Sequence, residues 1–298
     1  MSELIFEKFS EDGRQLIFDR SSLTNADKCL FYYQKKDIER WRSPRNNIAA
    51  AFGTLVHASL EEYDHVLTFA TYEEAVDAAV KKALELAPEL AESEDNARTP
   101  ETLVRAVVWY CDKYRNDPFK TAVIDIGDGP QVAVELRYEV DIPNTDYRMS
   151  GRIDRLAVYD GDLYIIDRKT TKLTITQKYL NSFMPGWQFA TYLWALPYMG
   201  LKVKGVLVEA CQTMVNGTRW ERERITMPRA NLAEHEREIQ NMVSRIDKAW
   251  EENFWPKSMA SCNMYGGCEM RFVCNAPVGM RERFLKDRFE VVPYTPPI

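Results

Sequence analysis

Residues 151–170 read GRIDRLAVYDGDLYIIDRKT, and this stretch decides the fold. The dipeptide Asp160-Gly161 is strongly preferred in two-residue type I′ turns, and apolar residues flank it on both sides, a pattern that predicts a β-hairpin. A two-residue turn also fixes the register, because it places Tyr159 opposite Asp162. The position of every other side chain across the hairpin then follows by counting.

Counting back from the turn locates the charged residues at the far end of the hairpin. Asp154 stands directly across from Asp167, with the two β-carbons roughly 5 Å apart, and Lys169 faces Arg152. Side chains alternate between the two faces of a strand, so Asp167 and Lys169 share one face while Arg168 points to the other. Two carboxylates and an amine therefore converge on one small surface.

The opposed carboxylates indicate a metal site. Like charges directly across a sheet repel each other, and a divalent cation removes that conflict. Oxygen ligands from Asp154 and Asp167 suit Mg²⁺ or Mn²⁺, and the Lys169 ammonium can orient or deprotonate an attacking water or stabilise charge on a phosphate. A solvent-facing hairpin edge with scattered charges is the alternative. The apolar run 163–166 favours a buried strand that ends in charge.

Further motifs extend this pattern on both sides. Gly-x-Ile-Asp at 151–154 is followed by Asp-x-Lys at 167–169 and then by Gln188-x-x-x-Tyr192. Upstream, Gly-Thr-Leu-Val-His occupies 53–57. Together these motifs resemble the PD-(D/E)xK nuclease superfamily in its RecB-like branch. The resemblance implies a restriction-endonuclease-like fold and metal-dependent hydrolysis of phosphodiester bonds.

The resemblance also implies a role for each motif residue. It assigns the metal ligands to three side chains and one backbone carbonyl, namely His57, Asp154, Asp167 and Arg168. It assigns catalysis to His57, Asp154, Asp167 and Lys169, with Lys169 serving the attacking water. Gln188 and Tyr192 fall four residues apart, hence on one face of a helix. In the family this pair lies beside the active site and helps to hold the nucleic acid.

Two acids ahead of the hairpin compete for one role. Relatives carry a glutamate before the second motif, and the strand-like segment 132–142 offers both Glu135 and Glu139. Side chains alternate along a strand, so both share one face and the sequence does not choose between them. A surface salt bridge is an equal alternative for either residue. Glu61, one helical turn after His57, is interpreted as a neighbour of a ligand or a solvated residue.

The six cysteines fall into two sets. Cys111 and Cys211 lie within a helical and a strand-like pattern, so we interpret both as buried apolar residues. The others are Cys29, Cys262, Cys268 and Cys274. Four thiolates suit either zinc or an iron–sulfur cluster. Their pattern is similar to that of the iron–sulfur subgroup, which includes the CRISPR-associated exonucleases and the AddB nuclease domain, and it implies a 4Fe-4S cluster that staples Cys29 to residues 262–274.

Composition excludes several classes of protein. With 45% hydrophobic and 28% charged residues, the chain has the composition of a globular protein rather than a disordered one. No apolar run is long enough to span a bilayer, and the N-terminus carries early acids instead of a basic segment before a long apolar core. We therefore expect a cytoplasmic protein with no membrane partner, whose cysteines are thiols or metal ligands.

The net charge of −6 conceals a segregation of charge along the chain. Residues 59–95 contain eleven Asp or Glu, whereas residues 168–208 contain no acid and six bases, interleaved with aromatic residues. Most of these aromatics belong to the core. The local field of the second segment nevertheless suits phosphates and unstacked nucleobases.

Hydrophobic periodicity predicts the order of the elements. Helices are expected near 26–40, 52–68, 72–90 and 100–116, strands from about 121 to 170, a helix that carries Gln188, strands near 202–226, and a long helix from 228 toward 255. This order predicts an α/β fold with a mixed central sheet flanked by helices and a Cys-rich iron–sulfur cap at the C-terminus. We expect one nuclease domain over residues 1–298, with a helical insertion at about 70–117.

The combined expectation is an Mg²⁺- or Mn²⁺-dependent deoxyribonuclease. It would be an exonuclease that acts at DNA ends or on single strands in recombination, repair or replication, with DNA and recombination or helicase proteins as partners. One alternative is a non-catalytic nucleic-acid-binding subunit of a helicase or adaptation complex that retains the nuclease scaffold; the intact Asp154, Asp167 and Lys169 set argues against it. A zinc-stapled RNA nuclease also stays open, since no feature reports on the 2′-hydroxyl.

Overall fold

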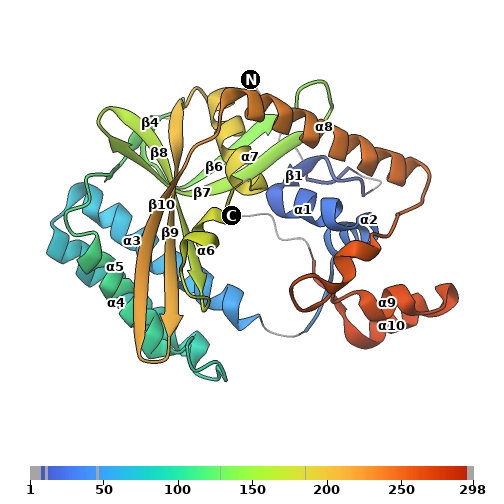
Figure 1. The fold of residues 1–298 in the computed structure, drawn as a ribbon, viewed down its shortest axis with the longest axis horizontal. Coiled ribbons are helices and arrows are strands. Elements are labelled where there is room, and N and C mark those ends of the chain that lie inside the picture. The colour runs from blue at the N-terminus through green and yellow to red at the C-terminus, as the bar shows by residue number, and fades with distance from the viewer. Residues whose placement is uncertain (1–7, 11–12, 45–46, 128, 185, 294–298) are drawn as a thin grey trace. The chain divides into compact units, whose positions relative to one another are not determined.

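The computed structural model describes residues 8–10, 13–44, 47–127, 129–184 and 186–293. The chain divides into two compact units, which we call unit 1 (Met1–Arg45, Glu139–Ser150 and Ala233–Ile298) and unit 2 (Asn46–Tyr138 and Gly151–Leu232). From residue 47 on, the predicted helices, strands and hairpin appear in the expected order along the chain (Figure 1).

The predicted hairpin is the centre of unit 2. Its strands are β7 (Arg148–Tyr159) and β8 (Asp162–Thr171), and they pair in antiparallel fashion with Tyr159 opposite Asp162. Asp160 and Gly161 have positive φ angles of 51° and 77°, as a type I′ turn requires. The predicted turn is therefore confirmed, and so is the register from Tyr159–Asp162 back to Arg155–Ile166.

The sheet of unit 2 is mixed. Beyond β8, β9 (Val203–Met214) runs parallel to β8, and β10 (Gly217–Ile225) runs antiparallel to β9. On the other side of the hairpin, β3 (Lys120–Thr121) and β6 (Val134–Asp141) both pair with β7. β4 (Val123–Asp125) and β5 (Pro130–Val132) form a small separate sheet. The parallel β8–β9 pair requires a crossover, and α6 (Gln177–Asn181), α7 (Trp187–Ala195) and η3 (Leu196–Met199) lie in it.

Helices cover both faces of this sheet. α3 (Ile48–Phe69), α4 (Tyr72–Leu86), η2 (Ala87–Leu90) and α5 (Pro100–Lys113) lie together beside β9 and β10 (Figure 1). Cys211 of β9 is buried in their apolar core, whereas its neighbour Ala210 packs against Leu180 of α6. Adjacent residues of a strand point to opposite faces, so α3–α5 and α6 lie on opposite sides of the sheet. The predicted α/β class, with a mixed central sheet flanked by helices, is confirmed.

Two helices of unit 2 begin at capping residues. Thr71 and Glu74 form a capping box at the start of α4, and Thr99 caps α5 ahead of Pro100 at its first position.

Cys111 and Cys211 are fully buried apolar residues, as predicted. Among the described residues, no helix is long and apolar enough to cross a membrane.

Unit 1 contains both ends of the chain. β1 (Ile17–Asp19) runs parallel to Arg148, Met149 and Ser150. The helices are α1 (Arg20–Lys28), α2 (Leu30–Tyr33), the π-helix η1 (Gln34–Ile38), α8 (Arg229–Glu251), which begins in unit 2, η4 (Met259–Gly266), α9 (Arg271–Asn275), η5 (Val278–Met280) and α10 (Arg281–Arg288). The short strands β2 (Trp41–Arg42) and β11 (Glu290–Val291) pair with each other.

The prediction of one helix near 26–40 is wrong. Asp19 caps α1 at its start, and α1 ends at Lys28 because Cys29 is extended, with φ −172° and ψ 117°. A new helix then begins at Leu30. The break places Cys29 in a non-helical position between the two helices.

Candidate metal and catalytic site

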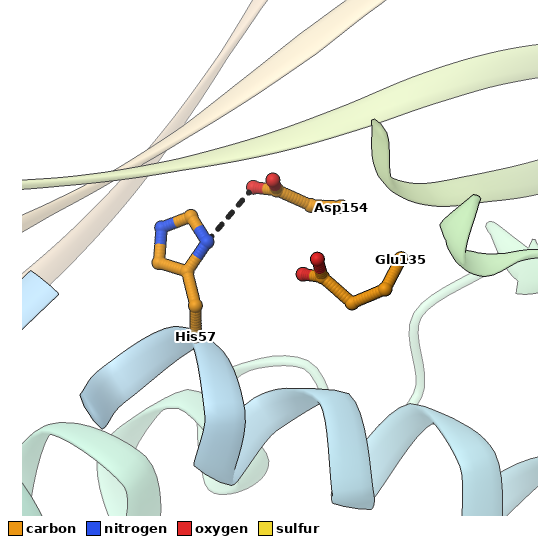
Figure 2. Close-up of side chains that lie close together, drawn as sticks. All are labelled: His57, Glu135 and Asp154. Atoms are coloured by element: carbon orange, nitrogen blue, oxygen red, sulfur yellow. Dashed lines mark ion pairs between the residues drawn. The ribbon is translucent and has the colours of Figure 1, made fainter. Parts of the chain in front are cut away.

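Three side chains of unit 2 form a group with the composition of a metal site. One ligand atom from each of His57, Glu135 and Asp154 lies within 4.8 Å of the other two. The imidazole comes from α3, and the two carboxylates come from β6 and β7, so three elements converge (Figure 2). Asp154 Oδ2 lies 3.3 Å from His57 Nδ1. Two carboxylates and an imidazole are ligands that suit Mg²⁺ or Mn²⁺.

His57 faces two oxygen atoms of the hairpin. Its Nε2 lies 2.9 Å from the carbonyl oxygen of Arg168, in addition to the Nδ1 contact with Asp154. Burial alone would lower the pKa of His57, but Asp154 and Asp167 outweigh that effect and raise it. The imidazole thus contacts two of the three oxygen groups of the hairpin that the resemblance assigned to metal binding.

Asp154 is held as an anion. Burial would raise its pKa, but His57, Lys169 and the Arg168 backbone N–H lower it to about 2. That N–H donates a 2.7 Å hydrogen bond to Asp154 Oδ2. The carboxylate is therefore charged at neutral pH and ready to bind a cation.

Asp167 is buried more deeply than Asp154, with 1% of its side chain exposed. Lys169 Nζ lies 2.5 Å from Asp167 Oδ2, and Gln188 Nε2 donates a 2.8 Å hydrogen bond to Asp167 Oδ1. Burial raises the pKa of Asp167 to about 6, with a further contribution from Asp154. Its role as a metal ligand stays a prediction, because the compact group of three contains Glu135 in its place.

Gln188 and Tyr192 lie on one face of α7, as predicted. Besides its bond to Asp167, Gln188 Nε2 donates to the Tyr192 hydroxyl at 2.8 Å, and that hydroxyl donates to the carbonyl oxygen of Arg152 at 3.1 Å. The pair thus connects α7 to both strands of the hairpin. The contacts orient Asp167; nucleic-acid binding by the pair stays a prediction.

The structure separates Glu135 from Glu139. Glu135 has a positive φ of 50°, which is uncommon for a residue with a side chain, and its carboxylate joins the group with His57 and Asp154. Burial, Asp154 and Glu61 raise its pKa to about 7. Glu139 lies in unit 1 and pairs with Arg148. Glu135 is therefore the acid of this strand that belongs to the site, and Glu61 is its electrostatic neighbour.

A comparison with protein families identifies the superfamily of the chain. The model of the PD-(D/E)XK nuclease superfamily matches residues 20–275, which include segments of both units. The chain belongs to this superfamily.

Among solved structures, a candidate exonuclease from Eubacterium rectale is 12% identical, with a TM-score of 0.51 over 88% of this chain and 92% of that one. At this identity the likeness concerns the fold alone. A second structure, of a protein called SSO0001, is 12% identical, with a TM-score of 0.31 over 66% of this chain and 84% of that one. No curated protein matches the sequence.

Next to the candidate site lies a network of buried charges that the sequence patterns did not reveal. Arg168 points away from Asp167 and Lys169, as predicted, and its guanidinium lies 2.7 Å from Asp64 Oδ2 and 3.3 Å from Glu209 Oε2. It also donates to the Tyr110 hydroxyl at 2.6 Å. Asp64 and Glu209 are fully buried. The network connects α3, α5, β8 and β9, and it includes three further residues, Arg155, Asp117 and Arg222.

One signal in the sequence could have indicated this network. Asp64 lies seven residues after His57, which is two helical turns along α3. It directly follows the buried residue Tyr63 and lies one turn after the buried residue Leu60. An acid on the apolar side of a helix requires a buried partner. The middle residue of the Asp-x-Lys motif, Arg168, is that partner.

The four cysteines assigned to a cluster line one cavity of unit 1. The cavity has a volume of about 460 Å³, and its lining also includes Tyr32 and Lys257. Backbone contacts hold its walls: the Cys268 N–H donates to the Cys262 carbonyl at 3.0 Å, and Lys257 donates to the Cys274 carbonyl at 3.1 Å. Burial raises the pKa of Cys268 and of Cys274, and the other cysteines add to this effect. The cavity is therefore built from the cysteines that sequence spacing grouped.

Proposed function

We propose that the chain is a divalent-cation-dependent DNA nuclease that hydrolyses phosphodiester bonds. The observation that carries the proposal is the grouping of His57, Glu135 and Asp154 beside the Asp167–Lys169 ion pair. Membership of the PD-(D/E)XK nuclease superfamily supports the same chemistry. DNA as the substrate, and an exonucleolytic action at ends or on single strands, are part of the proposal.

The donor set fits Mg²⁺ or Mn²⁺. Carboxylate oxygens from Asp154 and Glu135, an imidazole nitrogen and the Arg168 carbonyl are available on adjoining elements, with the Asp167 carboxylate next to them. The fit is also electrostatic, because the acids repel one another: Asp154 raises the pKa of both Asp167 and Glu135. A bound divalent cation supplies a more acidic water and charge neutralisation at the phosphate.

Lys169 is the hydrogen-bond donor that we assign to the proposed reaction. Its Nζ is paired with Asp167 at 2.5 Å, and 28% of its side chain is exposed, so it reaches both the acids and the solvent. We assign it to hydrogen bonding with the attacking water and with the phosphate as charge develops there. Gln188 fixes the orientation of Asp167 and therefore of the ammonium paired with it.

Charge segregation supports a nucleic acid as the substrate. Residues 169–208 begin at the proposed catalytic Lys169 and contain five bases and no acid. Within this segment the Tyr179 and Phe183 rings contact each other at 5.2 Å between centroids, and both side chains are partly exposed. Bases and aromatic rings together suit phosphates and unpaired nucleobases. Recombination, repair or replication, with partner helicase or recombination proteins, is the setting that we propose.

We also propose a 4Fe-4S cluster bound by Cys29, Cys262, Cys268 and Cys274. Their placement around one cavity supports it, as does the location of Cys29 at a break between two helices. The cluster would join the start of the nuclease domain to its end and so couple metal binding to folding. In this view residues 1–298 form one functional nuclease domain, with residues 70–117 as a helical insertion.

One cleavage experiment tests the nuclease proposal. End-labelled single-stranded and duplex DNA are incubated with Mg²⁺, Mn²⁺ or EDTA, and products are resolved by length. Wild-type protein should cut with either metal and not with EDTA. Lys169→Ala should lose cleavage, whereas Lys248→Ala, on α8 and paired with Glu252 at an exposed position, should retain it. Tight DNA binding without metal-dependent cleavage on any substrate would overturn the proposal in favour of a binding subunit.

A further inference from the structure

One exposed cation lies directly on the proposed metal site. Arg152 of β7 precedes Asp154 by two residues, so the two side chains leave the strand on the same face. Its Nε lies 2.6 Å from Glu135 Oε2, and 59% of the Arg152 side chain is exposed. The guanidinium therefore lies between the Glu135 carboxylate and the solvent, from which a substrate approaches.

The main chain at Arg152 is held firmly. A β-carbon at Gly151 would collide with the hydroxyl and ring of Tyr138, so only glycine fits there. The Tyr192 hydroxyl donates to the Arg152 carbonyl at 3.1 Å, and the Tyr138 and Tyr192 rings pack edge to face with centroids 6.1 Å apart. The backbone at Arg152 is thus fixed by these contacts, and the exposed side chain leaves it at a defined place.

Arg152 and a bound cation would compete for Glu135. In the free protein, Arg152 offsets the repulsion of Glu135 by Asp154 and by Glu61. A divalent ion between Glu135 and Asp154 would take over that role, and its charge would oppose the guanidinium. Arg152 would then have donors without an anionic acceptor, next to the metal and open to solvent.

A phosphodiester provides the acceptor. The planar fork of a guanidinium matches two oxygens of a phosphate, and such charge-assisted pairs are strong. We infer that Arg152 is a phosphate-binding residue, which leaves Glu135 when the metal binds and pairs with the non-bridging oxygens of the scissile phosphate. The inference rests on the proposed nuclease function and adds to it a role for the variable position of the Gly-x-Ile-Asp motif.

The exchange of Glu135 for a phosphate as the partner of Arg152 predicts that Arg152→Gln tightens Mn²⁺ binding but weakens DNA binding and cleavage. Removing a partly exposed competing charge should tighten Mn²⁺ binding in the absence of DNA by about two- to fivefold. Losing a charge-assisted bond to phosphate should weaken DNA binding in Ca²⁺ and lower kcat/KM by about tenfold to a hundredfold. Arg152→Lys keeps the charge without the fork, so its Mn²⁺ affinity should match wild type while its cleavage stays reduced.

The experiment measures Mn²⁺ binding by calorimetry, DNA binding by anisotropy and cleavage kinetics on one set of variants. The matched control is Arg148→Gln, an arginine of the same strand that pairs with Glu139 and Asp141 instead of the metal group. Unchanged cleavage in Arg152→Gln would overturn phosphate binding, and unchanged or weaker Mn²⁺ affinity would overturn the exchange. Absence of cleavage by wild type in the same assay would instead reject the nuclease proposal itself.

Discussion

Replacing Arg168 by methionine should destabilise the protein strongly. The side chain is 2% exposed and touches two fully buried acids, Asp64 and Glu209. Methionine fills a similar volume but leaves both carboxylates with one cationic partner fewer. Breaking a buried ion pair by removing one member costs about 3–5 kcal/mol. Each acid retains another arginine, Arg155 for Asp64 and Arg222 for Glu209, so we expect the lower end, about 3 kcal/mol.

Urea unfolding followed by far-ultraviolet circular dichroism measures this loss. Arg219→Met is the matched control, because Arg219 pairs with Glu221 on the surface, with 52% and 34% of the two side chains exposed. Exposed pairs of this kind contribute about 0–1 kcal/mol. If Arg168→Met lowered the free energy of unfolding by no more than this control does, the network would not stabilise the fold as we argue.

A double variant tests whether Asp64 is shared between two arginines. Asp64→Leu combined with Arg168→Met removes the Arg168–Asp64 pair, but it also takes Asp64 away from the buried Arg155. The double variant should therefore unfold at no higher urea than Arg168→Met alone. Mn²⁺ affinity should fall in Arg168→Met even where the protein is folded, since the same pair fastens α3, and with it His57, to β8.

Three other outcomes follow from the site and the cavity. Asp154→Asn should lower the Mn²⁺-dependent cleavage rate by at least about a hundredfold, whereas Asp162→Asn, at the exposed turn, should not; equal rates would contradict the ligand assignment. Burial raises the pKa of Asp167 to about 6 and of Glu135 to about 7, and both must lose a proton to bind a cation. Mn²⁺ affinity measured by calorimetry should therefore rise from pH 5.5 to 8, and a flat profile would contradict the arrangement. Cys268→Ser should abolish visible absorbance and bound iron and lower the yield of folded protein; full iron content in the variant would refute Cys268 as a ligand, and wild-type protein without iron would refute the cluster.

Sequence rules for turns, strands and helices were sufficient where neighbouring residues determine the structure. The Asp160-Gly161 turn fixed the hairpin register, and strand alternation then placed Arg168 on the face opposite to Asp167 and Lys169. Apolar periodicity likewise located the helices of unit 2.

Contacts between distant segments were beyond those rules. Glu135 and Glu139 are equivalent by alternation, and only the position of α3, which brings His57 and Glu61 alongside, distinguishes Glu135. The pairing of Arg168 with Asp64 joins a strand to a helix more than a hundred residues earlier in the chain. The helix break at Cys29 was missed because neither glycine nor proline marks it.

Anomalous diffraction from a crystal soaked in Mn²⁺ tests the central claim most directly. We predict a manganese peak within bonding distance of the Asp154 carboxylate and of the His57 imidazole, with Arg152 turned away from Glu135. A map without manganese at these side chains, in crystals of protein that cuts DNA with Mn²⁺, would contradict the account.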